Sequence, residues 1–363
     1  MKLRAWLHRI HHNGRPKPQG APVGEAAPAV PWTPLICNDT PAGRWAETVL
    51  RFGYQDLLTG LQNTVVFGSR VMGRDAVMKH IADLINKRYA QERHAAIYVD
   101  IREQVTTATL YNFTSVDAVF RDLVRLPFGV NALPADEQTA REGAQHLVRL
   151  EALLGVPLGK YNLLAVRDVV LQWLDSLSVQ NLTLVVDELS ALAPEFTPIL
   201  LQMLLDTFPR GGRISFRLGG EKQAMRLQER ARKGALGMQV NHDILISLDL
   251  EQVLQSTDVK PSYSDPRQAL LLGEVERISP SLAASLNEKP HPSWACLFDP
   301  PEAWYRLYES CEWNVELVVA ALEYLLPALA EADGSKANVE SINRATQFAK
   351  THAGSSRPSP QSR

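Results

Sequence analysis

Two glycines stand at a spacing that suits the binding of phosphate. The segment Gly68-Ser-Arg-Val-Met-Gly73-Arg74-Asp75 follows a short β-branched run and precedes a helical stretch. A phosphate-binding loop has the pattern G-x-x-x-x-G-K-[ST], in which backbone amides and a helix N-terminus hold the anion. Gly68 and Gly73 match this pattern, whereas Arg74 replaces the lysine and Asp75 replaces the metal-binding hydroxyl. We predict these four residues as nucleotide-binding residues, with an ordinary strand-turn-helix as the alternative.

Both replacements weaken the predicted phosphate site. Arginine is planar and bulkier than lysine, so Arg74 is not an equivalent donor to phosphate. Asp75 places a carboxylate where phosphate charge belongs, and it would also make a good helix cap. The backbone amides of the loop need no side chain and would still be able to hold an anion.

Two adjacent carboxylates end another apolar run. Residues 181–188 read Asn-Leu-Thr-Leu-Val-Val-Asp187-Glu188, which is the pattern of a buried strand with a polar end. At such a place in a nucleotide-hydrolysing site, the aspartate organises magnesium and the glutamate activates the attacking water. We therefore predict Asp187 as a magnesium ligand and Glu188 as the catalytic residue of an active site. The alternative is that the pair caps the next element. Asp100 is a weaker candidate because no second acid follows it.

The elements around these motifs predict a parallel sheet. Strands are predicted at 64–67, 95–101, 181–188, 213–218 and 242–249. Helices are predicted at 45–63, 74–89 and 195–208, with a further helical stretch within 106–180. Strand, turn, helix and strand in this order form a βαβ unit. The fold class is therefore α/β, with a three-layer αβα domain over residues 45–250.

The remaining segments flank this domain. Residues 1–44 are predicted to be a disordered, basic and proline-rich arm, and residues 353–363 a disordered tail. A connecting segment rich in proline and serine is expected over 251–295. Residues 296–352 are expected to form a small helical lid, whose aromatic side chains pack in its core.

The order of elements resembles the AAA+ and STAND group of P-loop ATPases, especially its origin-recognition-complex-like bacterial branch. The resemblance covers about residues 45–350 and rests on the Walker A position at 68–75, the Walker B position at 187–188 and a sensor-1 strand at 214–218. It implies ATP and magnesium as the cofactors of an active member. In the family the lid contains a turn usually written Gly-Asn-Pro-Arg, but Glu312-Trp-Asn-Val-Glu316 lacks the sensor-2 arginine.

Three residues that contact nucleotide or its metal in the family, the lysine, the hydroxyl residue and the sensor-2 arginine, are thus replaced in this chain. We predict a degenerate member, a non-hydrolysing or weakly nucleotide-binding scaffold that acts through a protein partner or an ATPase-like subunit. Two alternatives stay open. One is a divergent but active ATPase that uses Arg74 with Asp187 and Glu188. The other is a DNA-associated module of a bacterial conflict or defence system, contacting phosphates through the arm and the basic stretch 222–233.

The amino-acid composition excludes several classes of protein. The chain has 363 residues with 38 Lys+Arg and 40 Asp+Glu, so its net charge of -2 argues against a nucleic-acid footprint over the whole protein. Its three cysteines are too few and too scattered for a disulfide framework and predict a reducing cytoplasm. No apolar run approaches the length of a membrane span, and no G-x-S-x-G elbow indicates a serine hydrolase.

Overall fold

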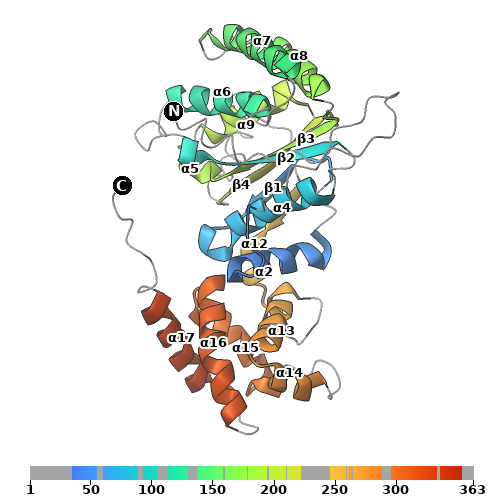
Figure 1. Ribbon diagram of the computed structural model, residues 1–363. Coiled ribbons are helices and arrows are strands. Elements are labelled where there is room, and N and C mark those ends of the chain that lie inside the picture. The colour runs from blue at the N-terminus through green and yellow to red at the C-terminus, as the bar shows by residue number, and fades with distance from the viewer. Residues whose placement is uncertain are drawn as a thin grey trace, which may run out of the picture. The chain divides into compact units, whose positions relative to one another are not determined.

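The structure is a computed structural model, and it describes the chain in separate stretches (Figure 1). The described residues are 35–54, 60–88, 93–104, 113–129, 137–157, 160–177, 179–193, 196–209, 211–221, 246–258, 260, 262, 265–287, 296–332 and 336–353. They fall into two compact units. Unit 1 takes its described residues from Met1–Ile36, Asp56–Phe67 and Met78–Leu248, and unit 2 from Cys37–Gln55, Gly68–Val77 and Asp249–Arg363.

Unit 1 is built on a five-stranded sheet with the strand order β2-β3-β4-β1-β5. The strands are β1 Thr64–Phe67, β2 His94–Asp100, β3 Asn181–Asp187, β4 Ile214–Gly220 and β5 Ile246–Asp249. The pairs β2–β3, β3–β4 and β4–β1 are parallel, as the βαβ pattern predicts. Because β1 and β3 run in the same direction on either side of β4, their last residues, Phe67 and Asp187, lie at the same edge of the sheet.

An apolar core covers one face of this sheet. Alternate strand residues such as Ile97, Leu184 and Phe216 point into it and are almost completely buried. The helices that cover them are α6 Phe113–Gly129, α8 Leu163–Ser176 and α9 Thr197–Thr207. Figure 1 shows α6 and α9 on one side of the strands and α4, Arg74–Arg88, on the other. The fold class is therefore α/β with three layers, as predicted.

A further helix, α7 Glu137–Leu154, packs on the outside of α8. The two helices approach closely where α7 carries a glycine, since a Cβ on Gly143 would lie 2.7 Å from the ring of Trp173. Trp173 is completely buried and stacks on Phe128 of α6 with ring centroids 5.8 Å apart. Helices α7 and α8 thus form a helical hairpin, which accounts for much of the helical stretch predicted within 106–180.

One predicted helix differs from the structure. The sequence pattern predicts a single helix over 45–63, but α2 spans Pro41–Val49 and widens into a π-helical turn at Leu50–Tyr54. Thr40 begins α2 by accepting a hydrogen bond from the Gly43 amide at 3.1 Å. Residues 60–62 are described as bends, not as helix. Glycines at 53 and 60 lower the helical propensity of this stretch, which is the physical reason for the early end.

Unit 2 contains the helices of the C-terminal third. They are α12 Leu250–Leu254, α13 Pro266–Ile278, α14 Pro280–Asn287, α15 Trp304–Ser310, α16 Val315–Glu331 and α17 Val339–Ala353. Arg267 is buried and donates to the carbonyls of Leu254, Ser256 and Asp258 at 2.7–3.0 Å. Its guanidinium also lies 5.0 Å from the ring centroid of Trp304. This one side chain ties α12, α13 and α15 together.

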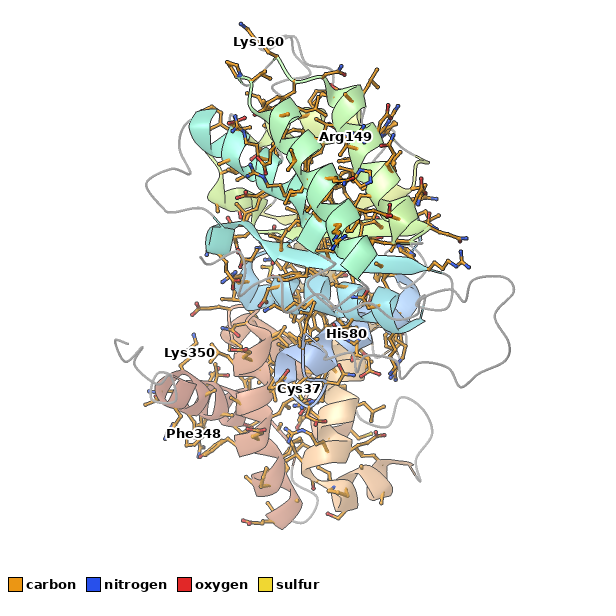
Figure 2. The ribbon with its side chains drawn as sticks, turned by 45° about the horizontal axis from the view of Figure 1, so that its top comes forward. Cys37, His80, Arg149, Lys160, Phe348 and Lys350 are labelled. Atoms are coloured by element: carbon orange, nitrogen blue, oxygen red, sulfur yellow. The ribbon has the colours of Figure 1, made fainter. Side chains whose placement is uncertain are left out.

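The predicted aromatic core of the lid is present in part. Trp304 and Tyr308 are completely buried, and the Tyr308 hydroxyl donates to the carbonyl of Arg267 at 2.7 Å. On the outside of α16 and α17, Tyr324 and Phe348 are exposed and stack with centroids 4.5 Å apart. Figure 2 shows Phe348 and Lys350 on α17.

The compact units divide the chain differently from the predicted segments. The segment 251–295, predicted as a connection, carries α12, α13 and α14, which group with the lid helices in unit 2. Residues 45–55 and 68–77 also belong to unit 2, although they were predicted within the αβα domain, and so do residues 37–44 of the predicted arm. Of the arm predicted over 1–44, residues 1–34 lie outside the described residues, whereas Pro41–Arg44 are helical and begin α2. Of the tail predicted over 353–363, residues 354–363 lie outside the described residues, and Ala353 ends α17.

Candidate functional site

The 68–75 loop, which connects β1 to α4, folds as a tight turn. A 3-10 turn spans Arg70–Met72, followed by Gly73 with φ of 77°. The amides of Met72 and Gly73 donate to the carbonyls of Ser69 and Arg70 at 3.2 and 2.8 Å. An amide that donates inside its own turn is not directed at a bound phosphate. Part of the predicted anion cradle is therefore used by the loop itself.

Arg74 turns back into this loop. It is the first residue of α4, is completely buried, and its Nη1 donates to the carbonyl oxygen of Gly68. The loop therefore presents an oxygen atom toward the guanidinium. A carbonyl oxygen attracts a cation and repels a phosphate, so this geometry is the opposite of an anion site. Asp75 follows in the first turn of α4, where its charge suits the helix dipole.

The space beside the two glycines is filled by side chains. A Cβ on Gly73 would lie 2.5 Å from the indole of Trp45, and Trp45 donates through Nε1 to the carbonyl of Met72 at 2.9 Å. A Cβ on Gly68, where φ is 147°, would lie 3.1 Å from Leu250 of α12. In a phosphate-binding loop, glycine leaves room for the ligand. Here both glycines make room for the protein's own side chains.

Asp187 ends β3 in a fully buried position. Its Oδ1 accepts from the Glu188 amide at 2.8 Å, and the Tyr98 hydroxyl lies 3.4 Å from Oδ2. Gly219 on β4 gives the carboxylate its place, because a Cβ there would lie 2.3 Å from Oδ1. Lys79 of α4 lies 5.6 Å from the ring centroid of Tyr98. The carboxylate is thus packed between two strands and held by its own backbone.

Glu188 is buried and has a left-handed backbone with φ of 66°. This conformation is uncommon for a residue other than glycine, asparagine or aspartate. Its Oε1 lies 3.1 Å from Nη2 of Arg102 and accepts from the Ser190 hydroxyl at 3.0 Å. The carboxylate that was predicted to activate water is therefore already paired with a cation and a hydroxyl.

Glu188 does not cap the element that follows it. It occupies the N-cap position of the 3-10 turn Leu189–Ala191, but its side chain makes no capping hydrogen bond. The alternative that the carboxylate pair serves as a helix cap is therefore wrong for Glu188. The physical reason is that its carboxylate is directed to Arg102 and Ser190.

The lid turn keeps the cap of its helix without the arginine. Asn314 begins α16 and accepts from the amides of Glu316 and Leu317 at 3.0 and 3.2 Å. Glu312 and Trp313 before it have φ of 55° and 61°, in the left-handed region. Glu316 is exposed in the first turn of α16.

The structure brings the predicted residues together in two groups. Gly68, Gly73 and Arg74 meet in unit 2, while Asp187 and Glu188 lie side by side in unit 1. Sequence reasoning missed the residues that complete each group, which are Trp45, Tyr98, Arg102, Gly219 and Leu250. Arg102 stands two residues after Asp100, at the end of the neighbouring strand, and this position is the signal that would have pointed to it. The others come from distant parts of the chain, which carry no local mark.

Other predicted sites lie beyond the described part of the chain. The basic stretch 222–233 and the basic N-terminal arm both do so. Within the described residues, no group of three or more His, Cys, Asp and Glu side chains is arranged to hold a metal ion. In the same part of the chain, no helix combines the length and the apolar character needed to cross a membrane.

Comparison with known proteins adds little to this geometry. The chain matches no model of a known protein family and no curated protein. Among solved structures it is similar to the ORC2 protein of Aeropyrum pernix, solved as ADPNP and ADP complexes. The identity is 14%, the match covers 90% of this chain and 73% of that chain, and the TM-score is 0.37. Such a match carries no assignment of function.

Proposed function

We propose that this chain is a P-loop NTPase-like protein that does not hydrolyse nucleotide and serves as a scaffold for protein partners. The observation that carries the proposal is the packing of the 68–75 loop, where Trp45 and Leu250 lie against the two glycines and Arg74 donates to the Gly68 carbonyl. ATP and magnesium fit this arrangement poorly, because the Met72 and Gly73 amides donate within the loop, the Gly68 carbonyl faces the Arg74 guanidinium, and a carboxylate follows at Asp75.

The carboxylate pair supports the same proposal. An aspartate that holds magnesium must offer an oxygen to the ion, and a catalytic glutamate must reach a water molecule. Asp187 is packed against Gly219 and holds the Glu188 amide, while Glu188 is engaged by Arg102 and Ser190. The pair is used inside unit 1, where it fixes the carboxyl end of β3.

Calorimetric titration of the full chain with ATP tests the first half of this proposal. We expect a dissociation constant weaker than about 1 mM, with and without magnesium, because a P-loop site relies on the lysine and the hydroxyl that Arg74 and Asp75 replace here. Phosphate release from ATP should be equally low for the wild type and for Glu188→Gln. Micromolar ATP affinity that disappears in Arg74→Ala, or phosphate release that disappears in Glu188→Gln, would show an active ATPase.

The second half of the proposal, a role through protein partners, is supported by the hairpin of α7 and α8. Val148 on α7 is 69% exposed and Leu164 on α8 is 58% exposed. Tyr161, just before α8, is anchored to α6, since it stacks on Phe120 with ring centroids 5.6 Å apart and accepts from Arg121 Nε at 2.8 Å. Exposed apolar side chains leave water when they dock on another protein, so this hairpin is our candidate docking element.

Cross-linking tests this surface, because Lys160 in the connector is exposed and projects outward (Figure 2). In extracts of the cells that naturally make this protein, an amine-reactive cross-linker should join Lys160 to the same partner protein in each repeat of the experiment. The double variant Val148→Asp, Leu164→Asp should lose this product while it keeps the wild-type melting temperature. Val339→Asp, at an exposed position of α17, is the matched control and should keep it. An unchanged product in the double variant would exclude the hairpin as the docking surface.

A further inference from the structure

Arg74 is a completely buried arginine of unit 2. A buried charge costs free energy unless the protein compensates it, so the surroundings of this side chain must be built to receive it. The Gly68 carbonyl, six residues earlier in the chain, is turned toward it and accepts a hydrogen bond. The 68–75 loop is thus shaped as a receptor for a planar cation.

The packing around the loop explains why this receptor holds one shape. Gly73 lies against Trp45 of α2, and Gly68 lies against Leu250 of α12. The 3-10 turn Arg70–Met72 also packs against α12 and α16. The loop is therefore the point at which α2, α12 and α16 of unit 2 meet. In a nucleotide-dependent protein, a bound ligand would order such a loop and release it when it leaves.

We propose that the Arg74 side chain is an internal ligand of the 68–75 loop, which holds the loop and its neighbours in unit 2 permanently in one arrangement, without nucleotide. This inference rests on the proposed function, because a loop that is filled by its own arginine has no phosphate to respond to. It goes further in assigning the guanidinium the ordering role of a ligand. Arg74 is a positioning residue, and its loss leaves a cavity with the size and hydrogen-bonding partner of a guanidinium ion.

Chemical rescue tests this inference on the full chain. Arg74→Ala should lower the melting temperature by about 5 to 10 °C, as expected for the loss of a buried, hydrogen-bonded side chain. Guanidinium ion at about 20 mM, well below the molar concentrations that unfold proteins, should restore a substantial part of that loss. The same concentration of sodium chloride should not. Arg70→Ala is the matched control, since Arg70 is an exposed arginine of the same loop. It should melt within about 1 °C of the wild type and show no rescue.

Two results would overturn the inference. One is an Arg74→Ala variant that melts like the wild type; the other is a destabilised variant for which guanidinium acts no better than sodium. If Arg74→Ala fails to fold, the melting temperatures of Arg74→Met and Arg74→Lys test the inference instead. Methionine keeps the apolar volume and lysine keeps a charged donor, so the lysine variant should melt at the higher temperature. The reverse order, or equal temperatures, would mean that Arg74 acts by packing alone.

The titrations separate this inference from the proposed function. Tight ATP binding by the wild type would contradict the proposed function whatever the melting temperatures show. Absence of guanidinium rescue would contradict the internal ligand and would leave a non-hydrolysing scaffold in place.

Discussion

Buried ionisable side chains shape unit 1 at the scale of single residues. His94 at the start of β2 lies 2.8 Å from the Thr183 hydroxyl, which lies 3.0 Å from that of Ser215. Burial, and then the charge of Arg217, lower the pKa of His94 to about 4. Asp83 of α4 accepts hydrogen bonds from the amides of residues 35 and 36 at 3.0–3.2 Å. Burial raises its pKa to about 6, against the opposing effect of those amides.

These two shifts have opposite consequences for stability against acid. The pKa of His94 is below its unfolded value of 6.5, so its contribution to stability falls as the pH drops from 6.5 to 4. The pKa of Asp83 is above its unfolded value of 3.8, so its contribution is full below 3.8 and is lost as the pH rises through 6. Each amounts to about 3 kcal/mol, so the two largely cancel between pH 4 and 6 in the wild type.

Variants that remove one of the two groups should reveal the pH dependence that the other group contributes. Asp83→Asn leaves His94 alone, so its free energy of unfolding should fall relative to the wild type by about 2 to 3 kcal/mol on going from pH 6.5 to 4. In His94→Gln only the shifted pKa of Asp83 remains, so its free energy of unfolding should rise relative to the wild type by a similar amount over the same pH range. Urea unfolding at each pH measures both. If the free energy of unfolding depended on pH in the same way for the wild type and both variants, the pKa values of His94 and Asp83 would not be shifted in the folded protein.

At the scale of elements, α4 closes an edge of the sheet. β2 is an edge strand, and its outer backbone groups would be open to another chain. Asn86 of α4 donates to the Ala96 carbonyl at 3.1 Å and accepts from the Ala96 amide at 2.9 Å. One side-chain amide thus makes the two hydrogen bonds that a neighbouring strand would make. This explains why α4 carries a polar residue at the buried position of Asn86.

Asn86→Ala should therefore open the edge at Ala96. The variant leaves a buried amide and carbonyl without these partners, which costs about 1 to 3 kcal/mol of unfolding free energy. Hydrogen exchange of the Ala96 amide should accelerate. Asn86→Asp should be no more stable than Asn86→Ala, since it keeps the acceptor, loses the donor and buries a charge. Lys87→Ala, at the exposed neighbouring position, should stay within about 0.5 kcal/mol of the wild type. An Asn86→Ala variant as stable as Lys87→Ala would contradict the role.

At the scale of the whole molecule, the chain forms two compact units that interleave in the sequence. Unit 1 has the apolar core beneath α6, α8 and α9, and unit 2 has a core of lid helices tied by Arg267. Separate cores predict separate responses to damage, because each unit loses only its own packing.

Two core variants test this division. Leu184→Ala removes a completely buried side chain of β3 and should lower the stability of unit 1 by about 2 to 5 kcal/mol. Arg267→Ala removes the side-chain donor to three carbonyls and the ion pair with Asp265, and it should lower the stability of unit 2 by about 3 kcal/mol or more. Hydrogen exchange should show the loss of protection in β3 for the first variant and in α16 for the second. Equal losses in both places for both variants would mean one cooperative unit.

The fold followed from local patterns with few corrections. Short β-branched runs mark β1 and β3 because buried parallel strands are apolar on both faces, and both were predicted within one residue of their bounds. The helix predicted over 45–63 was too long, since apolar periodicity alone does not show where glycines end a helix. The assignment of residues 68–77 to unit 2 depends on packing with segments about 180 residues away, which no local pattern records.

The sequence by itself determined the parallel αβα architecture, the positions of the glycine turn and the carboxylate pair, and the replacement of lysine by Arg74. Only the tertiary structure decided what these residues do. Arg74 would be a divergent phosphate ligand or an internal cation according to where its guanidinium points, and Glu188 would be a base or half of an ion pair according to its neighbours. Both outcomes depend on Trp45, Leu250 and Arg102, whose contacts arise from distances in space and not from spacing along the chain.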